Sequence, residues 1–202
     1  YETTAPASSV TAISSYWQIS SPLTITATAS DTGGSGLKNV TLYYYNSTNN
    51  STFSGPWEFD TDTDPWVSVS WAFNFPNGTQ YYRFYSIAGD NATNTETAPT
   101  DNDTICGYDN AAPTSSVNAI SSYWQTASPI TVTATASDTG PSGLANIELW
   151  VRNSTNNATF SVWWSVETDT ASPWQWSFNF PNGTGYYEFY GRARDNATNY
   201  ED

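Results

Sequence analysis

The residues of this chain best suited to chemistry are asparagines in Asn-x-Ser/Thr triplets. Such a triplet is the acceptor for an N-linked glycan, which is bulky and therefore needs an exposed turn or loop. Eleven asparagines stand in such triplets: Asn39, Asn46, Asn49, Asn50, Asn77, Asn91, Asn102, Asn153, Asn157, Asn182 and Asn196. We expect several of them to carry sugars. The alternative is that Asn and Thr serve here only as turn and strand residues.

Four acceptors of the first half of the chain recur at matching places in the second half. The pairs are Asn46/Asn153, Asn50/Asn157, Asn77/Asn182 and Asn91/Asn196. All four fall in expected turns or hairpin tips, from which a glycan reaches solvent. The last two pairs are the best candidates for glycosylation.

Three groups of aspartates could bind an ion or stabilise a turn. Asp60, Asp62 and Asp64 have the alternating spacing of calcium loops, but the usual Gly is absent, so a solvated acidic loop is the preferred interpretation and a calcium site the alternative. Ca2+ is the only cofactor that the sequence suggests. A second ion could lie at a domain junction, held by Asp101, Asp103 and Asp109. Asp31, Asp138, Asp90 and Asp195 begin turns, where we expect their side chains to accept backbone hydrogen bonds.

The chain is poor in the groups that enzymes use. It contains no His, which excludes Ser-His-Asp, Cys-His and His-metal sites. Its single cysteine, Cys106, cannot close an internal disulfide. A paired-carboxylate glycosidase using Glu58 or Glu148 is disfavoured because their surroundings differ between the two halves. We therefore expect no catalytic residues and no enzymatic activity.

The charge of the chain limits its partners. There are 5 Lys and Arg against 19 Asp and Glu, which gives a net charge of −14. Nothing here could neutralise phosphates, so nucleic acid is excluded as a partner, and an anionic membrane face is disfavoured. No apolar run is long enough to span a membrane. Because the chain begins at Tyr1 and contains no Met, we expect a processed product or a part of a longer array.

An internal repeat determines the domain organisation. Residues 5–54 align without gaps on residues 112–161, and 36 of these 50 positions are identical. The similarity continues with WAFNFP at 71–76 and WSFNFP at 176–181. We predict two domains, residues 1–107 and 108–202, with a linker at about 97–111 that could also hold a last strand. The second domain has no counterpart of residues 98–107.

The hydrophobic pattern has a period of two. Apolar residues alternate with Thr in 23–29 and again in 130–136, which is typical of half-buried strands. Further inward rows are expected at 40–44, 71–75 and 82–88, with turn residues between them. The fold class is therefore all-β. About seven short strands in about 100 residues indicate an immunoglobulin-like antiparallel β-sandwich, here two in tandem.

Three segments also carry a family resemblance. They read TATASDTGGSGLKNVTLYYY, FNFPNGT and YYRFYSIAGDNATN. The sequence resembles the Ig-like or fibronectin-III-like repeats of archaeal and bacterial cell-surface proteins, over nearly all of both copies. The resemblance implies an extracellular location and places Tyr82 and Tyr187 at the tyrosine corner. The antibody-type disulfide is missing, so packing alone must hold the core.

Aromatic residues repeat between the domains and have two interpretations. They are Tyr16-Trp17/Tyr123-Trp124, Trp57/Trp164 and Trp66/Trp174. Trp and Tyr at strand positions mostly belong to a sandwich core or to a subunit contact. They could instead form a flat face that binds sugars.

These features together favour a structural protein. We predict an extracellular, N-glycosylated subunit or repeat unit of a surface filament, stalk or surface layer. Its partners are copies of itself, joined head to tail, and its covalent N-glycans. The contact would involve Tyr1 and Pro6 of one copy and Tyr200 and Asp202 of the next. The alternative is a carbohydrate-binding adhesin module that uses exposed Trp and Tyr.

Overall fold

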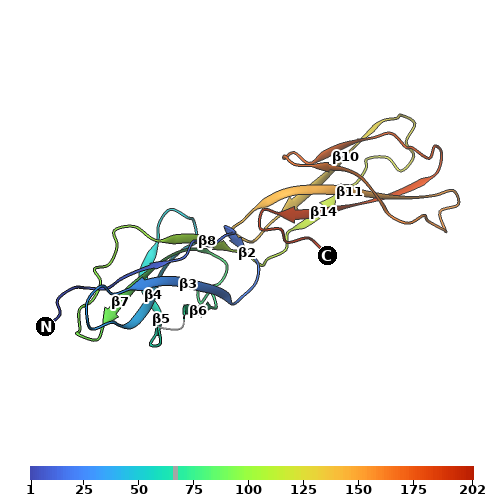
Figure 1. Ribbon diagram of the computed structural model, residues 1–202. Coiled ribbons are helices and arrows are strands. Elements are labelled where there is room, and N and C mark those ends of the chain that lie inside the picture. The colour runs from blue at the N-terminus through green and yellow to red at the C-terminus, as the bar shows by residue number, and fades with distance from the viewer. Residues whose placement is uncertain (66–67) are drawn as a thin grey trace. The chain divides into compact units, whose positions relative to one another are not determined.

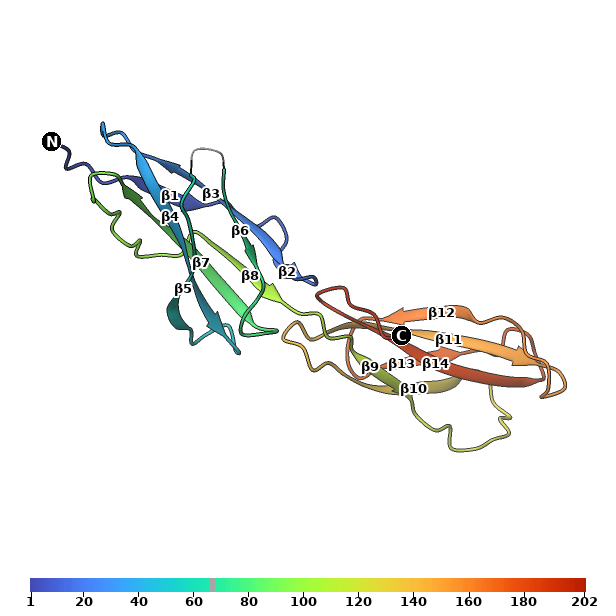
Figure 2. The ribbon, with the colours of Figure 1, turned by 90° about the horizontal axis from the view of Figure 1, so that it is seen from below.

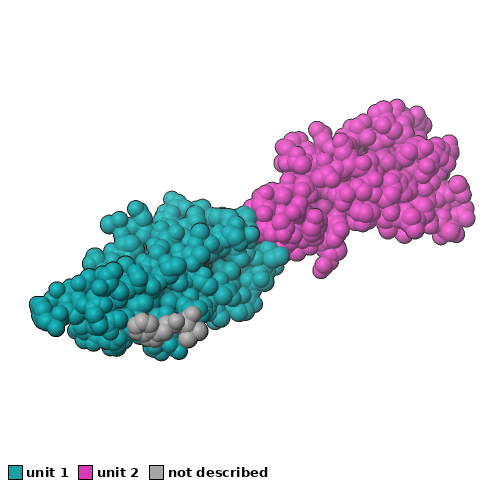
Figure 3. Space-filling model, viewed as in Figure 1, with its two compact units in different colours: residues 1–110 teal, residues 111–202 magenta. Residues whose placement is uncertain are grey.

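The alternating apolar residues form strands in the computed structural model, which describes residues 1–65 and 68–202. These strands belong to two units, Tyr1–Asn110 and Ala111–Asp202 (Figure 3). No helix capable of crossing a bilayer was found in the described ranges. The predicted all-β class is confirmed, and each unit is a sandwich of two sheets.

The described residues of unit 1 form eight strands in two sheets (Figure 1). The first sheet, in the order β1-β3-β6, consists of β1 (Ala7–Val10), β3 (Leu23–Ser30) and β6 (Val69–Phe73). The second, in the order β2-β8-β7-β4-β5, consists of β2 (Trp17–Gln18), β8 (Thr104–Tyr108), β7 (Tyr81–Asp90), β4 (Leu37–Ser47) and β5 (Ser54–Asp62). Neighbouring strands are antiparallel except β2 and β8, which are parallel.

Unit 2 repeats this plan with six strands (Figure 2). One sheet has the order β13-β10-β9, with β9 (Thr114–Val117), β10 (Ile130–Ser137) and β13 (Gln175–Phe178). The other has the order β12-β11-β14, with β11 (Leu144–Ser154), β12 (Trp164–Asp169) and β14 (Tyr186–Asp195). None of the residues that the structure describes in unit 2 forms a counterpart of β2 or β8.

The predicted inward rows form the core of unit 1. Val40, Leu42 and Tyr44 of β4 are buried, while the residues between them are only partly covered. The core is rich in aromatic rings, and Phe73 lies at its centre, fully buried. Five other rings have centroids within 5.4 Å of the Phe73 ring. Because neither unit contains a disulfide, this packing replaces the covalent cross-link of antibody domains.

The predicted tyrosine corner is confirmed in both units. The Tyr82 hydroxyl donates to the Gly78 carbonyl at 2.7 Å, and the Tyr187 hydroxyl donates to the Gly183 carbonyl at 2.8 Å. Both glycines have positive φ, 76° and 70°, which a residue with a Cβ rarely adopts. Burial raises the pKa of Tyr82, so the hydroxyl keeps its proton and donates.

A glutamate fastens the two sheets of each unit to each other. The Glu96 carboxylate accepts hydrogen bonds from the backbone N–H and the hydroxyl of Ser8, in the first sheet. It also accepts the N–H of Ala88, in the second sheet, at 2.9 Å. In unit 2 the Glu201 carboxylate accepts the same three bonds, from Ser115 and Ala193. The sequence analysis did not single out this clamp.

The segment at about 97–111 was expected to be a linker, or a last strand followed by a short linker, and the structure has the strand. It contains β8, which pairs with β7 and belongs to the second sheet of unit 1. Thr104, Cys106 and Tyr108 of β8 are buried, and burial raises the pKa of the Cys106 thiol to about 12. The strand reads TICGY, so it lacks the regular apolar alternation of the other strands. The unit boundary falls at Asn110.

Candidate functional site

The glycan acceptors at hairpin tips are accessible. Asn50 and Asn157 lie in the turns that follow β4 and β11, and Asn77 and Asn182 lie in the turns that precede β7 and β14. All four side chains are exposed. The side-chain oxygen of Asn77 accepts a hydrogen bond from the Tyr44 hydroxyl at 3.1 Å, whereas a glycan attaches to the side-chain nitrogen.

The acceptors at the ends of β7 and β14 have a structural role. The side-chain nitrogen of Asn91 donates to the carbonyls of Ser35, Gly36 and Leu37 at 3.0–3.2 Å. Asn196 makes the same three bonds in unit 2. A glycan would use this same nitrogen and would compete with these bonds. The side-chain nitrogen of Asn182 makes a single such bond, to the side-chain oxygen of Asn153 at 3.1 Å. Geometry therefore favours the pair at 77 and 182 over this one.

Four of the five remaining acceptors are less accessible than those at the tips. Asn39, Asn46, Asn102 and Asn153 are half-buried, while Asn49 is exposed. The Asn46 amide group bridges two residues, donating to Gln80 at 2.8 Å and accepting from Trp57 at 3.1 Å. The Asn49 side-chain oxygen accepts the N–H groups of Ser51 and Thr52, which closes the turn. We therefore rank these acceptors below the exposed tips.

The acidic run considered for calcium has local partners. Asp60 accepts the N–H of Thr61, and Asp62 accepts the N–H of Asp64 at 2.9 Å. Within the described ranges, these three carboxylates are not among the acidic groups whose oxygens converge. Calcium binding here stays a prediction.

The aspartates proposed for a junction ion lie in unit 1 and differ in exposure. Asp101 is exposed, and Asp109 is buried. One carboxylate oxygen of Asp103 accepts the N–H groups of Val10 and Ser86, at 2.8 and 3.3 Å. Asp103 thus joins β1 to β7, which is a structural role.

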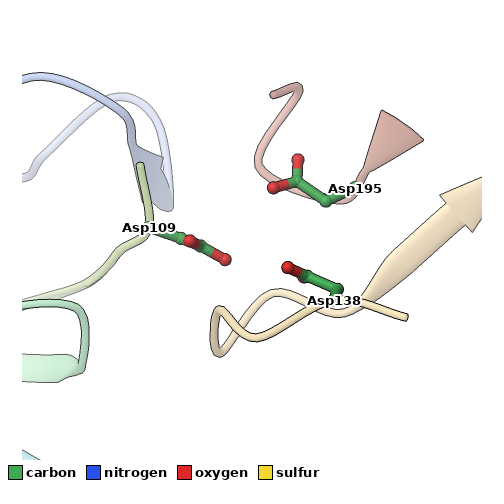
Figure 4. A group of neighbouring side chains, drawn as sticks. All are labelled: Asp109, Asp138 and Asp195. Carbon is green, nitrogen blue, oxygen red and sulfur yellow. The ribbon is translucent and has the colours of Figure 1, made fainter. Parts of the chain in front are cut away.

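The turn role predicted for four other aspartates is confirmed. Asp31 and Asp138 each accept the N–H of the glycine two residues later, at 2.8 and 3.0 Å. Asp90 and Asp195 each accept the N–H of the asparagine four residues later, at 2.7 Å. Desolvation acts to raise the pKa of Asp90, but hydrogen bonds from Asn94 outweigh it and hold that pKa below its usual value. Figure 4 shows Asp138 and Asp195 of unit 2; Asp109, also drawn, belongs to unit 1.

The repeated aromatic residues are not all in the core. Trp57 is 50% exposed, and Tyr123 and Trp124 are 72% and 65% exposed. Trp17, the counterpart of Trp124, is half-buried. Trp66 lies outside the described residues. The two glutamates considered for a glycosidase site both accept hydrogen bonds from neighbouring side chains. Glu58 accepts one from Tyr43, and Glu148 accepts one each from Trp150 and Ser165.

The residues predicted for head-to-tail contact differ in exposure. Tyr1 and Asp202 are exposed, and Pro6 is buried. The Tyr200 ring is 49% exposed, and the guanidinium groups of Arg192 and Arg194 lie 4.9 and 5.3 Å from its centroid.

Unit 2 has a groove along β14. It has a volume of about 620 Å³ and is lined by Trp124, Phe180, Tyr186, Tyr187 and Phe189, among others. The corresponding place in unit 1 is filled by β8. Sequence reasoning identified the missing counterpart of residues 98–107 but did not identify the groove. The signal was present, because the aromatic residues that face β8 in unit 1 recur in unit 2.

The chain is similar to known proteins in two comparisons. Residues 93–189 match the family described as the bacterial Ig domain. Among solved structures, the chain is similar to the fibronectin(III)-like modules of Clostridium thermocellum CbhA, at 16% identity and a TM-score of 0.43, over 96% of this chain and 89% of that chain. Curated protein sequences gave no match. Residues 93–189, just under half of the chain, are therefore similar to the bacterial Ig domain family.

Proposed function

We propose that the protein is a non-enzymatic, N-glycosylated extracellular structural protein whose copies join head to tail in a surface filament, stalk or surface layer. Bacterial Ig domains and fibronectin(III)-like domains are often extracellular and generally non-catalytic. The observation that carries the proposal is the edge position of β14. In unit 1 the second sheet continues past β7 to β8 and β2, whereas β14 is the last strand of its sheet, and residues 200–201 pair with it only near Ala193 and Arg194. An unpaired sheet edge is a template for strand addition from another chain.

The surface composition supports a glycan coat. Only 12% of the residues are charged, while aromatic residues reach 16%. A surface with few charges and exposed rings is prone to association. Glycans at the exposed hairpin tips would cover such a surface and restrict contacts between copies to the two ends of each copy.

We expect the native protein to form long fibres of fixed repeat in electron micrographs. Two heterologous contacts per copy build an open fibre when the rotation between copies does not close a ring. Denaturing electrophoresis is the control, because a band near 22.1 kDa plus glycan indicates separate subunits, whereas a very high mass indicates one continuous array. A monodisperse monomer in native buffer would contradict the proposal.

We expect the intact mass of the native protein to fall on deglycosylation. Asn77→Gln and Asn182→Gln should each remove the mass of one glycan, because both side chains are exposed at hairpin tips. Asn74→Gln is the matched control, since Asn74 is an exposed neighbour outside any acceptor triplet. A native mass equal to that of the bare 22.1 kDa chain would refute the prediction.

A second candidate function is carbohydrate binding. The exposed rings of Tyr123 and Trp124, with centroids 5.3 Å apart, favour it, as does exposed Trp57. Binding to a glycan array that is abolished by Trp57→Ala or Trp164→Ala would support this alternative.

A further inference from the structure

We propose that the outer face of the three-stranded sheet that contains β3 in unit 1, and β10 in unit 2, carries O-linked glycans. The acceptors are Thr24, Thr26 and Thr28 in unit 1 and Thr131 and Thr135 in unit 2. This hydroxyl face consists of the outward residues of β1, β3 and β6 in one unit and of β9, β10 and β13 in the other. For the extracellular location the inference rests on the proposed function. The choice of acceptors rests on the composition and geometry of the six strands.

The six strands of the hydroxyl face contain no charged residue. None of the 5 Lys and Arg or the 19 Asp and Glu residues lies in them. The strands of the other sheet do carry charges, such as Lys38 of β4, Arg83 of β7 and Glu148 of β11. None of the eleven N-glycan acceptors lies in the six strands either. Charges or a covering group normally keep an exposed sheet and its edges from associating, so this face needs another cover.

The exposed side chains of this face are mostly hydroxyls. In unit 1, β3 presents Thr24, Thr26, Thr28 and Ser30, all exposed. Strand propensity alone does not explain this composition, because it also favours Val, Ile, Tyr and Phe. What Ser and Thr share is a hydroxyl group, which is the acceptor of an O-linked glycan. Stalks rich in Ser and Thr are a known class of O-glycosylated chain.

The second copy of the repeat retains this row of hydroxyls. In β10 the same four positions are Thr131, Thr133, Thr135 and Ser137. Between them the inward residues change, for example from Ile25 to Val132. The outward hydroxyls are thus kept where a core residue varies. Thr133 is half-buried and accepts a hydrogen bond from Asn118 at 2.9 Å, so we do not propose it as an acceptor.

Small neighbours surround the row in β3. The residues directly opposite on β1 and β6 are Ser or Ala, and all are exposed. The pairs are Thr24/Ala72, Thr26/Ser70, Thr28/Ser9 and Ser30/Ala7. Adjacent strands are only about 4.8 Å apart, so large side chains there would hinder an enzyme or a glycan. The small ones leave the hydroxyls of the central strand open.

The three threonine hydroxyls of β3 are also free to react. Those of Thr24, Thr26 and Thr28 bond to no other residue that the structure describes. By contrast, Thr41 on the other sheet shares a hydrogen bond of 2.9 Å with Thr61. An enzyme that modifies the row in β3 therefore has no internal hydrogen bond to break.

The modification is a glycosyl transfer to this chain. The Oγ1 atom of the threonine forms a bond to the anomeric carbon of a sugar donor, which is activated as a nucleotide- or lipid-linked phosphate ester. The bond between that carbon and the phosphate oxygen of the donor breaks, and the phosphate leaves. The hydroxyl proton passes to a base of the transferring enzyme. The present chain supplies the acceptor and no catalytic group.

Digestion of the native protein provides a test that N-linked sugars cannot disturb. A protease that cleaves after Glu and Asp releases residues 3–31 and 110–138, and each peptide contains one of the two rows. Neither peptide contains an Asn in an acceptor triplet, so any sugar on it is O-linked. We expect each mass to exceed that of the bare peptide by at least one sugar residue, which alkaline β-elimination removes. Electron-transfer fragmentation should place the sugar on the proposed threonines.

Variants made in the native source test the positions. Combined Thr24→Val, Thr26→Val and Thr28→Val changes should abolish the added mass on residues 3–31. Val is a strong strand former and the positions are exposed, so the unfolding midpoint should stay that of the parent. Thr3→Val is the matched control, because Thr3 is exposed in the same peptide but precedes β1. It should leave the added mass unchanged. The digest of the native protein decides the question even where a variant fails to fold.

The outcomes separate this inference from the proposed function. Both peptides at their bare masses would overturn the inference, even if N-glycans are present and fibres form. Sugar confined to hydroxyls outside the face, such as those of Ser14 and Ser15, would overturn it too. Sugar on the proposed threonines of a protein that stays monomeric would support the inference and overturn the proposed assembly.

Discussion

A Phe73→Ala variant is expected to lose about 3–5 kcal/mol of the free energy of unfolding of unit 1. Phe73 is fully buried, and five rings surround it with centroids within 5.4 Å. Rings that contact one another on both sheets cannot all move into the space left behind, so a cavity remains. Since the unit has no disulfide, nothing covalent compensates for the loss.

Cys106 provides the measurement for unit 1 alone. It is the single cysteine, it is buried in β8, and its raised pKa of about 12 keeps the thiol protonated at neutral pH. Thiol labelling in increasing urea therefore reports the opening of unit 1. The matched control is Phe178→Ala, which changes unit 2 and should leave the urea midpoint of Cys106 labelling unchanged. A midpoint for Phe73→Ala equal to that of the parent would contradict the prediction.

The second large effect is expected from the glutamate clamp. Glu96→Gln should destabilise unit 1 by about 1–3 kcal/mol, because an amide nitrogen replaces an acceptor and faces donors of Ser8 or Ala88. Glu201→Gln should do the same in unit 2, where the bonds are equivalent. Urea unfolding followed by tryptophan fluorescence measures both.

The control for the clamp is Glu58→Gln. Glu58 is exposed and contacts Tyr43 at 3.5 Å, so its replacement should change the stability by less than about 0.5 kcal/mol. If Glu96→Gln is as mild as this control, the carboxylate does not fasten the sheets.

Much of the fold follows from short-range pattern in the sequence. Alternation predicts the inward rows of β3, β4, β6 and β7, because successive residues of a strand point to opposite faces. The turn aspartates and the tyrosine corner are equally local, since Tyr82 bonds to Gly78 only four residues away. For the same reason, the repeat transfers each of these features to unit 2.

The features that the sequence analysis left open or missed depend on distant partners. It left open whether residues 97–111 hold a last strand, because β8 has no apolar alternation and is defined by its pairing with β7 and β2. The role of Asn91 was equally hidden, because an acceptor triplet does not reveal that its nitrogen donates to carbonyls more than 50 residues away. The Glu96 clamp spans 88 residues to Ser8. Such contacts are properties of the folded sandwich.

The place of β8 in chain order has a consequence for biosynthesis. β8 is the last strand of unit 1 to leave the ribosome, and its parallel partner β2 is among the first. Until Tyr108 has emerged, Phe75, Tyr82 and Phe84 of the nascent unit 1 lack the strand that helps to bury them. Tandem repeats of such similar sequence can exchange strands between neighbouring nascent chains. The time before residue 108 emerges is therefore the period in which such exchange competes with correct folding.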